Sequence, residues 1–343
     1  LWYKVGSSYE TAGQTGLSHA LEHMMFKGSR KLDAGEASRI LRELGAEENA
    51  FTSDDYTAYY QVLARDRLAV AFELEADRLA SLKLPPDTDD KPSSLAYERF
   101  KTIAYPASGY RNPTIGWMAD LNRMQADELR AWYEQWYAPN NATLVVVGDV
   151  TADEVRGLAE RFFGDIEKRE VPAAKRPLEL AEPGERRLKL HVKTQLPTLL
   201  MAFNAPSLAT EENARQVHAL RLISALLDGG YSARLPERLE RGEELVTSAS
   251  AWYDAYARGD SLFVLSAAPN MQKGRTLEED SITQQATTIG KLETVGLSWR
   301  LMDEELSALE AVTPEDIQQA ASTYFTRSRL SVAHVLPEEA RDE

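Results

Sequence analysis

Apolar residues recur along the chain with two different periods, and these predict helices and strands in a mixed order. The helical period covers residues 16–27, 34–44, 68–82, 126–137 and 213–227. Strand-like patterns cover residues 1–5, 49–63, 143–147, 188–192 and 198–203. Glycine or proline follows most of these segments, as expected where a helix or strand ends. The pattern therefore predicts that both helices and strands build the protein.

The two halves of the chain resemble each other. Residues 169–187 hold three prolines and many charges, which is typical of a linker. In the first half, an acidic segment at 127–129 lies seven residues before the aromatic pair at 136–137, and in the second half 315–317 has the same spacing to 324–325. His218 and its neighbours faintly repeat the pattern around His19. We therefore predict a duplicated α+β unit, with domains at 1–168 and 188–343 and a degraded polar site in the second.

Composition excludes several classes of function. The 343 residues suggest about two domains. The net charge of −15 argues against binding to nucleic acid or anionic membranes, although it would suit a basic or extended polypeptide. The longest apolar runs, such as residues 144–147, are too short to cross a bilayer, so no transmembrane segment is expected. The absence of cysteine excludes disulfides, thiolate nucleophiles and cysteine-based zinc sites.

Two of the five histidines fall within one turn of the first predicted helix. His19, Glu22 and His23 have the spacing H-x-x-E-H, which places all three on one helix face. Neutral imidazoles are preferred zinc ligands, and a catalytic zinc site has three protein ligands and an open position for water. Zinc lowers the pKa of that water to about 7, and Glu22 would accept its proton and pass it to a leaving amine.

The alternative is that these histidines are ordinary packed or exposed residues. A chance H-x-x-E-H is expected in roughly one chain of this composition per hundred, so the motif favours a metal site.

The motif and its surroundings resemble the pitrilysin/insulinase family of zinc peptidases, which includes the mitochondrial processing peptidases. The most specific segment is residues 16–28, GLSHALEHMMFKG. Further matches are Gly6 and Ser7 with Glu10, residues 49–52 and 75–78, Pro113 with residues 115–116, and residues 137–149. The resemblance covers most of the chain and is strongest in its first half.

The resemblance implies an α+β fold with two homologous domains, each a mainly antiparallel sheet with helices packed on one face. Residues 1–168 would form the zinc-binding catalytic domain. His19 and His23 would bind one Zn²⁺ per chain, and Glu22 would be the general base on a zinc-bound water. The implied activity is that of a zinc endopeptidase.

Asn49, Ala50, Phe51 and Thr52 match the family's edge strand, which pairs with the backbone of the peptide substrate. The physics agrees, because an exposed strand edge offers unpaired N–H and C=O groups to an extended chain. The alternative for this segment is plain sheet packing. Tyr56, Tyr59 and Tyr60 are assigned to packing.

The sequence departs from the family pattern at the third zinc ligand. The family uses a Glu on a later helix, and no such helix follows the prolines at 85–86. We predict that the segment carrying this ligand is absent from the numbering near Asp87–Thr88. Glu98 lies at nearly the right distance from His23, but its surroundings do not match. A second break is expected near Glu279–Asp280.

A second departure lies in the C-terminal domain, where active family members carry an Arg and a Tyr that bind substrate and stabilise the oxyanion. Glu240 and Thr247 stand at the matching positions. A carboxylate cannot stabilise an oxyanion, and threonine is too short to replace tyrosine. We therefore expect a homologous partner subunit to supply the pair, in a heterodimer or a multiple of it that admits unfolded peptide.

Two other functions remain open at this point. One is a non-catalytic scaffold subunit of a peptidase-like complex, and the other is a metal-binding module without peptidase activity. The natural substrate cannot be read from the sequence. Exported relatives favour a periplasmic location, with the cytoplasm as the alternative.

Overall fold

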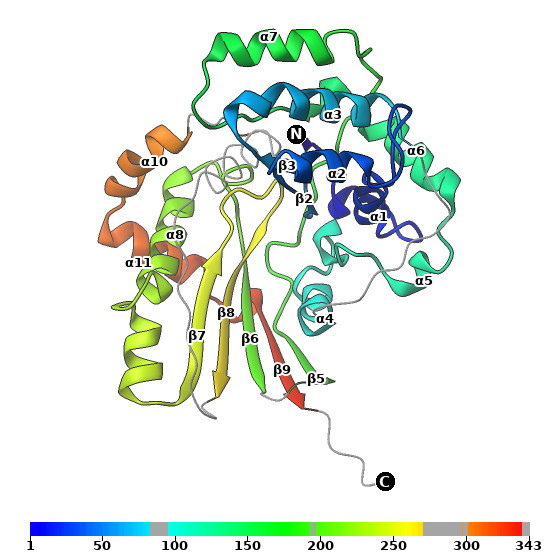
Figure 1. Cartoon of the computed structure of the whole chain (residues 1–343). Helices are drawn as coiled ribbons and strands as arrows, with labels where there is room; N and C mark the ends of the chain where they lie inside the picture. The colour runs from blue at the N-terminus through cyan, green and yellow to red at the C-terminus, as the bar shows by residue number, and fades with distance from the viewer. Residues whose placement is uncertain (83–94, 193, 195–196, 270–296, 298–300, 338–343) are drawn as a thin grey trace. The chain divides into compact units, whose positions relative to one another are not determined.

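The computed structural model describes residues 1–82, 95–192, 194, 197–269, 297 and 301–337 (Figure 1). Its chain divides into two compact units. Unit 1 consists of Leu1–Lys91, Asn112–Lys175 and Glu279–Trp299, and unit 2 consists of Pro92–Arg111, Arg176–Glu278 and Arg300–Glu343. The domain boundaries inferred from the sequence stay a prediction. The predicted breaks near Asp87–Thr88 and Glu279–Asp280 lie outside the described residues.

Unit 1 contains a four-stranded sheet in the order β2-β3-β1-β4, and all its neighbouring strands are antiparallel. The strands are β1 (Trp2–Tyr3), β2 (Glu47–Thr52), β3 (Thr57–Val62) and β4 (Ala142–Thr143). The helices are α1 (Leu17–Met24), α2 (Glu36–Glu43), α3 (Leu68–Ala80), α5 (Met118–Leu121), α6 (Ala126–Trp136) and α7 (Ala152–Phe163).

The strand predicted at 143–147 is shorter than expected. Only Ala142 and Thr143 pair with β1, because β1 itself offers only Trp2 and Tyr3 as partners.

The core of unit 1 lies between the sheet and helices α1 and α6. Leu17, Leu21 and Met24 lie on one face of α1 and are almost completely buried. They pack in one cluster with aromatic residues of β1, β3 and α6, among them Tyr3, Tyr59, Trp132, Tyr133 and Tyr137. Burial of each such apolar side chain contributes about 1.5–3 kcal/mol, which is enough to fix the orientation of a two-turn helix. The opposite, polar face of α1 is thereby turned away from the core.

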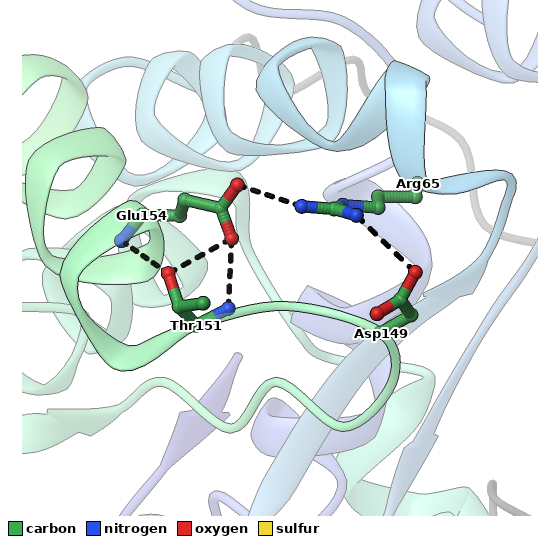
Figure 2. A network of polar contacts seen from close by, with 4 residues as sticks. All are labelled: Arg65, Asp149, Thr151 and Glu154. Carbon is green, nitrogen blue, oxygen red and sulfur yellow. Dashed lines mark hydrogen bonds and ion pairs between the residues drawn. The ribbon is translucent and has the colours of Figure 1, made fainter.

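An exposed polar network joins the start of α3 to α7 (Figure 2). Arg65, in the turn before α3, contacts Asp149 at 3.2 Å and Glu154 at 2.8 Å. Thr151 caps α7, since its hydroxyl accepts from the backbone N–H of Glu154 while the Glu154 carboxylate accepts from the backbone N–H of Thr151. Hydrogen bonds from Thr151 and Arg65 lower the pKa of Glu154 to about 2. Because the residues are exposed, we assign this network to local capping and not to a site.

Unit 2 contains a five-stranded sheet in the order β5-β9-β6-β8-β7. Its strands are β5 (Arg186–Val192), β6 (Thr198–Ala205), β7 (Val246–Tyr253), β8 (Ser261–Pro269) and β9 (Leu330–Pro337). The pair β5-β9 is parallel, and the other pairs are antiparallel. The helices are α4 (Leu95–Ala104), α8 (Ala214–Asp228), α10 (Leu301–Glu310) and α11 (Pro314–Tyr324).

Helices cover both faces of the unit 2 sheet. Phe263 of β8 packs in one cluster with Leu220 of α8 and Ala320 of α11. The next residue, Val264, points to the opposite face and packs in a cluster with Phe100 and other residues of α4. The α+β class with two mainly antiparallel sheets, predicted from the sequence, is confirmed. The placement of α4 against unit 2 adds a helix on the second face, which the sequence pattern does not indicate.

In the described part of the chain, no helix combines the length and the apolar character that a bilayer span requires.

Candidate active site

Helix α1 presents His19, Glu22 and His23 on a single turn. The ring centroids of the two histidines lie 4.7 Å apart, with their planes at 62°. Nδ1 of His19 lies 3.6 Å from Oε2 of Glu22. The spacing of the motif therefore produces the cluster that was expected from the sequence. The roles of the three residues as ligands and base stay a prediction.

The three side chains differ in exposure. His23 is exposed and His19 is partly buried, whereas the Glu22 side chain is only 9% exposed. The imidazoles thus remain accessible to an ion from solvent, while the carboxylate is held beneath them. Oε2 of Glu22 accepts a hydrogen bond of 2.5 Å from the hydroxyl of Thr52, at the end of β2.

Strand β2 forms an edge of the unit 1 sheet, since among the described strands it pairs only with β3. The backbone N–H of Ser53 donates to the carbonyl of Tyr56 at 2.8 Å. Hydrogen-bonded and non-hydrogen-bonded pairs alternate along an antiparallel ladder, so the backbone groups of Ala50 and Thr52 point away from β3, toward the open edge. The edge predicted to receive peptide is therefore adjacent to Glu22.

The four residues predicted to bind substrate divide between the two faces of β2. Ala50 packs against the core beneath α1, and Thr52 reaches Glu22. Phe51 points the other way and packs edge-on against Trp2, with ring centroids 5.5 Å apart. Asn49 is exposed, and its side-chain oxygen accepts from the backbone N–H of Ala50 at 2.9 Å. Their role in substrate binding stays a prediction.

The start of α1 is fixed by a close approach of two glycines. Gly16 precedes α1 with φ +90°, and Gly116 has φ +88°. A Cβ atom at Gly116 would lie 2.6 Å from Cα of Gly16, and one at Gly16 would lie 2.6 Å from the carbonyl oxygen of Ile115. Only glycine fits both the conformation and the space. This contact sets where the motif-bearing helix begins.

Glu10 supplies the N-terminal cap that α1 lacks in its own sequence. Its two carboxylate oxygens accept from the backbone N–H groups of Gly16 at 2.6 Å and Ser18 at 2.7 Å. Gly16 has no side chain to cap the helix, and the first turn holds no acidic residue. A carboxylate at this end satisfies free N–H groups and complements the helix dipole. Sequence matching singled out Glu10 but gave it no role, because its partners follow six and eight residues later.

Burial raises the pKa of Glu10 from 4.5 to about 7. The carboxyl group of Glu10 therefore binds its proton more tightly in the folded chain than in the unfolded chain. Protonated Glu10 therefore contributes to the free energy of unfolding. This contribution is fully present below pH 4.5 and falls by about 3 kcal/mol as the pH rises through 7. We expect the unfolding free energy of the wild type, relative to Glu10→Gln, to drop by about this amount between about pH 4.5 and about pH 8. Chemical denaturation of both proteins measures it, and a constant difference would contradict this assignment.

A third zinc ligand is not among the described residues. In the chain segments for which side chains are described, no group of three or more His, Asp or Glu residues could hold a metal ion. Glu98 lies on α4 of unit 2, where partial burial raises its pKa. The predicted position of the missing ligand, near Asp87–Thr88, lies outside the described residues. His19 and His23 have the donor chemistry for zinc and fit two of the three protein positions that a catalytic site needs.

Glu75 begins the matched segment 75–78, and its carboxylate is bound within unit 1. It is 4% exposed, and its carboxylate accepts from Arg78 and from Gln61. The guanidinium of Arg78 lies over the ring of Tyr59, 4.7 Å from its centroid. The matched segment 75–78 therefore forms a buried ion pair in the core of unit 1. An acidic and a basic residue three apart on a helix are the only signal of this pair in the sequence.

In unit 2, the residues at the expected Arg and Tyr positions form hydrogen bonds with nearby backbone groups. Glu240 accepts from the backbone N–H of Ala249 at 2.8 Å, and the hydroxyl of Thr247 donates to the carbonyl of Ala268 at 3.3 Å. Nearby, the guanidinium of Arg241 stacks over the ring of Tyr231 at 4.0 Å. This Arg–Tyr contact has a different spacing and order from the family's pair.

Comparisons with known families match both halves of the chain. A model described as Insulinase (Peptidase family M16) matches residues 1–104, and one described as Peptidase M16 inactive domain matches residues 123–284. The zinc protease PqqE of Helicobacter pylori is 29% identical over 300 residues, which cover 82% of this chain and 66% of that protein. The chain thus spans about two thirds of this relative.

Solved structures share the fold. The crystal structure of a protease from Helicobacter pylori has a TM-score of 0.87 at 24% identity and covers 98% of this chain and 93% of that one. The periplasmic protease PqqL from Escherichia coli has a TM-score of 0.78 at 15% identity, and the match covers 98% of this chain but only 44% of PqqL. At these identities the likeness shows the fold alone.

Proposed function

The chain belongs to peptidase family M16, the insulinase family, and on that premise we propose that it is a zinc endopeptidase subunit that cleaves unfolded or extended peptides. The observation that carries the proposal is the turn of α1, where two accessible imidazoles flank a buried carboxylate next to an open strand edge. Relatives named zinc proteases support the same reaction class.

His19 and His23 would hold zinc from one side of α1, together with a third ligand. When bound, the ion would polarise the scissile carbonyl and acidify the attacking water. Glu22 would accept the proton from this water and deliver it to the leaving amine. The carboxylate is only 9% exposed, and the hydrogen bond from Thr52 restrains its orientation.

An extended peptide would add to the sheet of unit 1 as a further strand beside β2. The outward backbone groups of Thr52 and the outward carbonyl of Ala50 would pair with the peptide backbone, whatever its side chains. The N–H of Ala50 would join them once it leaves the side-chain oxygen of Asn49. Backbone pairing of this kind requires an unfolded segment, because a folded substrate has already paired its own N–H and C=O groups. This supports a preference for extended substrates.

We further propose that a homologous partner supplies the missing Arg/Tyr pair in a heterodimer. The second half matches a domain described as inactive, and Glu240 and Thr247 stand where the pair is expected. The chain corresponds to less than half of PqqL, whose first half has been crystallised separately. These observations favour a subunit that works with a second, similar unit. A periplasmic location stays a prediction, which cell fractionation would test.

A non-catalytic scaffold is the second candidate. The match of the second half to a domain described as inactive favours it. Against it stands the intact cluster of His19, Glu22 and His23, which a scaffold has no need to keep.

A peptidase assay separates the two candidates. The complete protein would be assayed alone and with a homologous chain that carries the Arg/Tyr pair, using an extended peptide with a fluorophore and quencher. We expect cleavage by the mixture, little by this chain alone, and none after a chelator removes the metal. A zinc-free mixture that assembles but does not cleave would favour the scaffold.

A further inference from the structure

Thr52 is the last residue of β2, the strand predicted to pair with the peptide substrate. Its side chain makes a contact that this position does not predict. Its hydroxyl donates a 2.5 Å hydrogen bond to Oε2 of Glu22, a residue 30 positions earlier in the chain. Bonds to an ionised acceptor are shorter and stronger than those between neutral groups. The contact connects the last residue of β2 to the second turn of α1.

The surroundings hold Thr52 in place. Across the ladder it lies opposite Thr57 of β3, which is fully buried. The hydroxyl of Thr57 donates to the carbonyl of Val5 at 3.0 Å. This bond anchors β3 next to Thr52. Thr52 is itself β-branched and has few rotamers. Its hydroxyl is presented to Glu22 from a rigid position.

Among the described residues, the polar contacts given for the Glu22 carboxylate engage one of its two oxygens. Thr52 and His19 both approach Glu22 through Oε2, at 2.5 Å and 3.6 Å. A base held through one oxygen can present the other, Oε1, to the attacking water without searching among rotamers. Glutamate is among the side chains that lose the most rotamer entropy when they become ordered. A Glu22 carboxylate that is already held in place therefore raises the rate of the catalysed step.

We propose that Thr52 is a positioning residue, whose hydroxyl fixes the Glu22 carboxylate while its backbone faces the peptide-binding edge. The inference rests on the proposed role of Glu22 as general base. It removes the Thr52 side chain from the residues that would contact substrate side chains, and it ties the base to the strand that would receive the peptide.

Two substitutions test this role in the complete protein with its partner. Thr52→Val keeps the β-branched shape and removes the hydroxyl, whereas Thr52→Ser keeps the hydroxyl. We expect Thr52→Val to lower kcat about ten- to a hundredfold with KM, zinc content and peptide preference unchanged. Thr52→Ser should recover most of the loss. Thr102→Val is the control, since it removes a threonine hydroxyl of α4 in unit 2, which donates to the carbonyl of Arg99, and it should leave kcat unchanged.

A second readout is independent of activity. In metal-free protein, the ¹³C signal of the Glu22 carboxyl group should shift in Thr52→Val and stay in place in Thr52→Ser and Thr102→Val. An unchanged kcat and signal in Thr52→Val would overturn the positioning role while the wild type still cleaves. A raised KM with altered peptide preference would make Thr52 a substrate contact and also overturn it. If the wild type and Glu22→Gln both leave the peptide intact, the proposed function itself fails.

Discussion

Replacing Glu22 by glutamine is expected to abolish peptide cleavage and leave zinc bound. Glutamine has nearly the same shape and can still accept the hydrogen bond from Thr52, so the packing of α1 is preserved. It cannot take a proton from water, and loss of a general base typically costs 10²–10⁴-fold in rate. Steady-state kinetics of the assembled protein measure the loss, and elemental analysis of the same sample measures the zinc.

A matched control is available on the neighbouring helix. Glu43→Gln alters an exposed carboxylate of α2 that pairs with Arg39, and it should leave both kcat and zinc content unchanged. A Glu22→Gln protein that cleaves at the wild-type rate would show that another group removes the proton, or that the chain is not the catalytic subunit.

Replacing His23 by glutamine is expected to remove zinc and activity together. A catalytic zinc site has only three protein ligands, and loss of outer-shell partners alone already weakens binding 10–100-fold. Loss of a direct ligand should therefore weaken zinc affinity by at least about a hundredfold. His23 is exposed, so the fold should survive, and the melting temperature of the metal-free protein should match that of the wild type.

His191→Gln is the corresponding control. His191 is exposed on β5 of unit 2, where its Nδ1 lies 3.4 Å from the carbonyl oxygen of Pro337. Zinc titration of both metal-free variants compares them directly. Equal zinc affinity in His23→Gln and the wild type would remove His23 from the metal site.

Elements with local signals could be predicted from the sequence, and those that depend on distant pairing could not. Helices α1, α2 and α8 lie close to their predicted ranges because apolar periodicity and a following glycine mark them. Helix α7 carries a capping box from Thr151 to Glu154, a local signal that lies outside the apolar pattern. The parallel pairing of β5 with β9 joins segments more than 130 residues apart, and no local pattern encodes it.

The same distinction between local and distant signals applies to the residues of the candidate site. His19, Glu22 and His23 meet because one helical turn brings positions i, i+3 and i+4 together, whatever the rest of the fold. The contacts of Glu10 and Thr52 with α1 depend on how a loop and a strand pack against the helix, so residue spacing cannot indicate them. A resemblance can mark such residues, but only the structure shows what each side chain touches.

Elemental analysis of the complete protein, combined with X-ray absorption at the zinc edge, tests the central claim most directly. The proposal predicts one zinc ion per chain with two imidazole nitrogens among its ligands, both supplied by the turn of α1. A protein that is fully assembled and carries no zinc, or whose zinc has no histidine nitrogen around it, would contradict it.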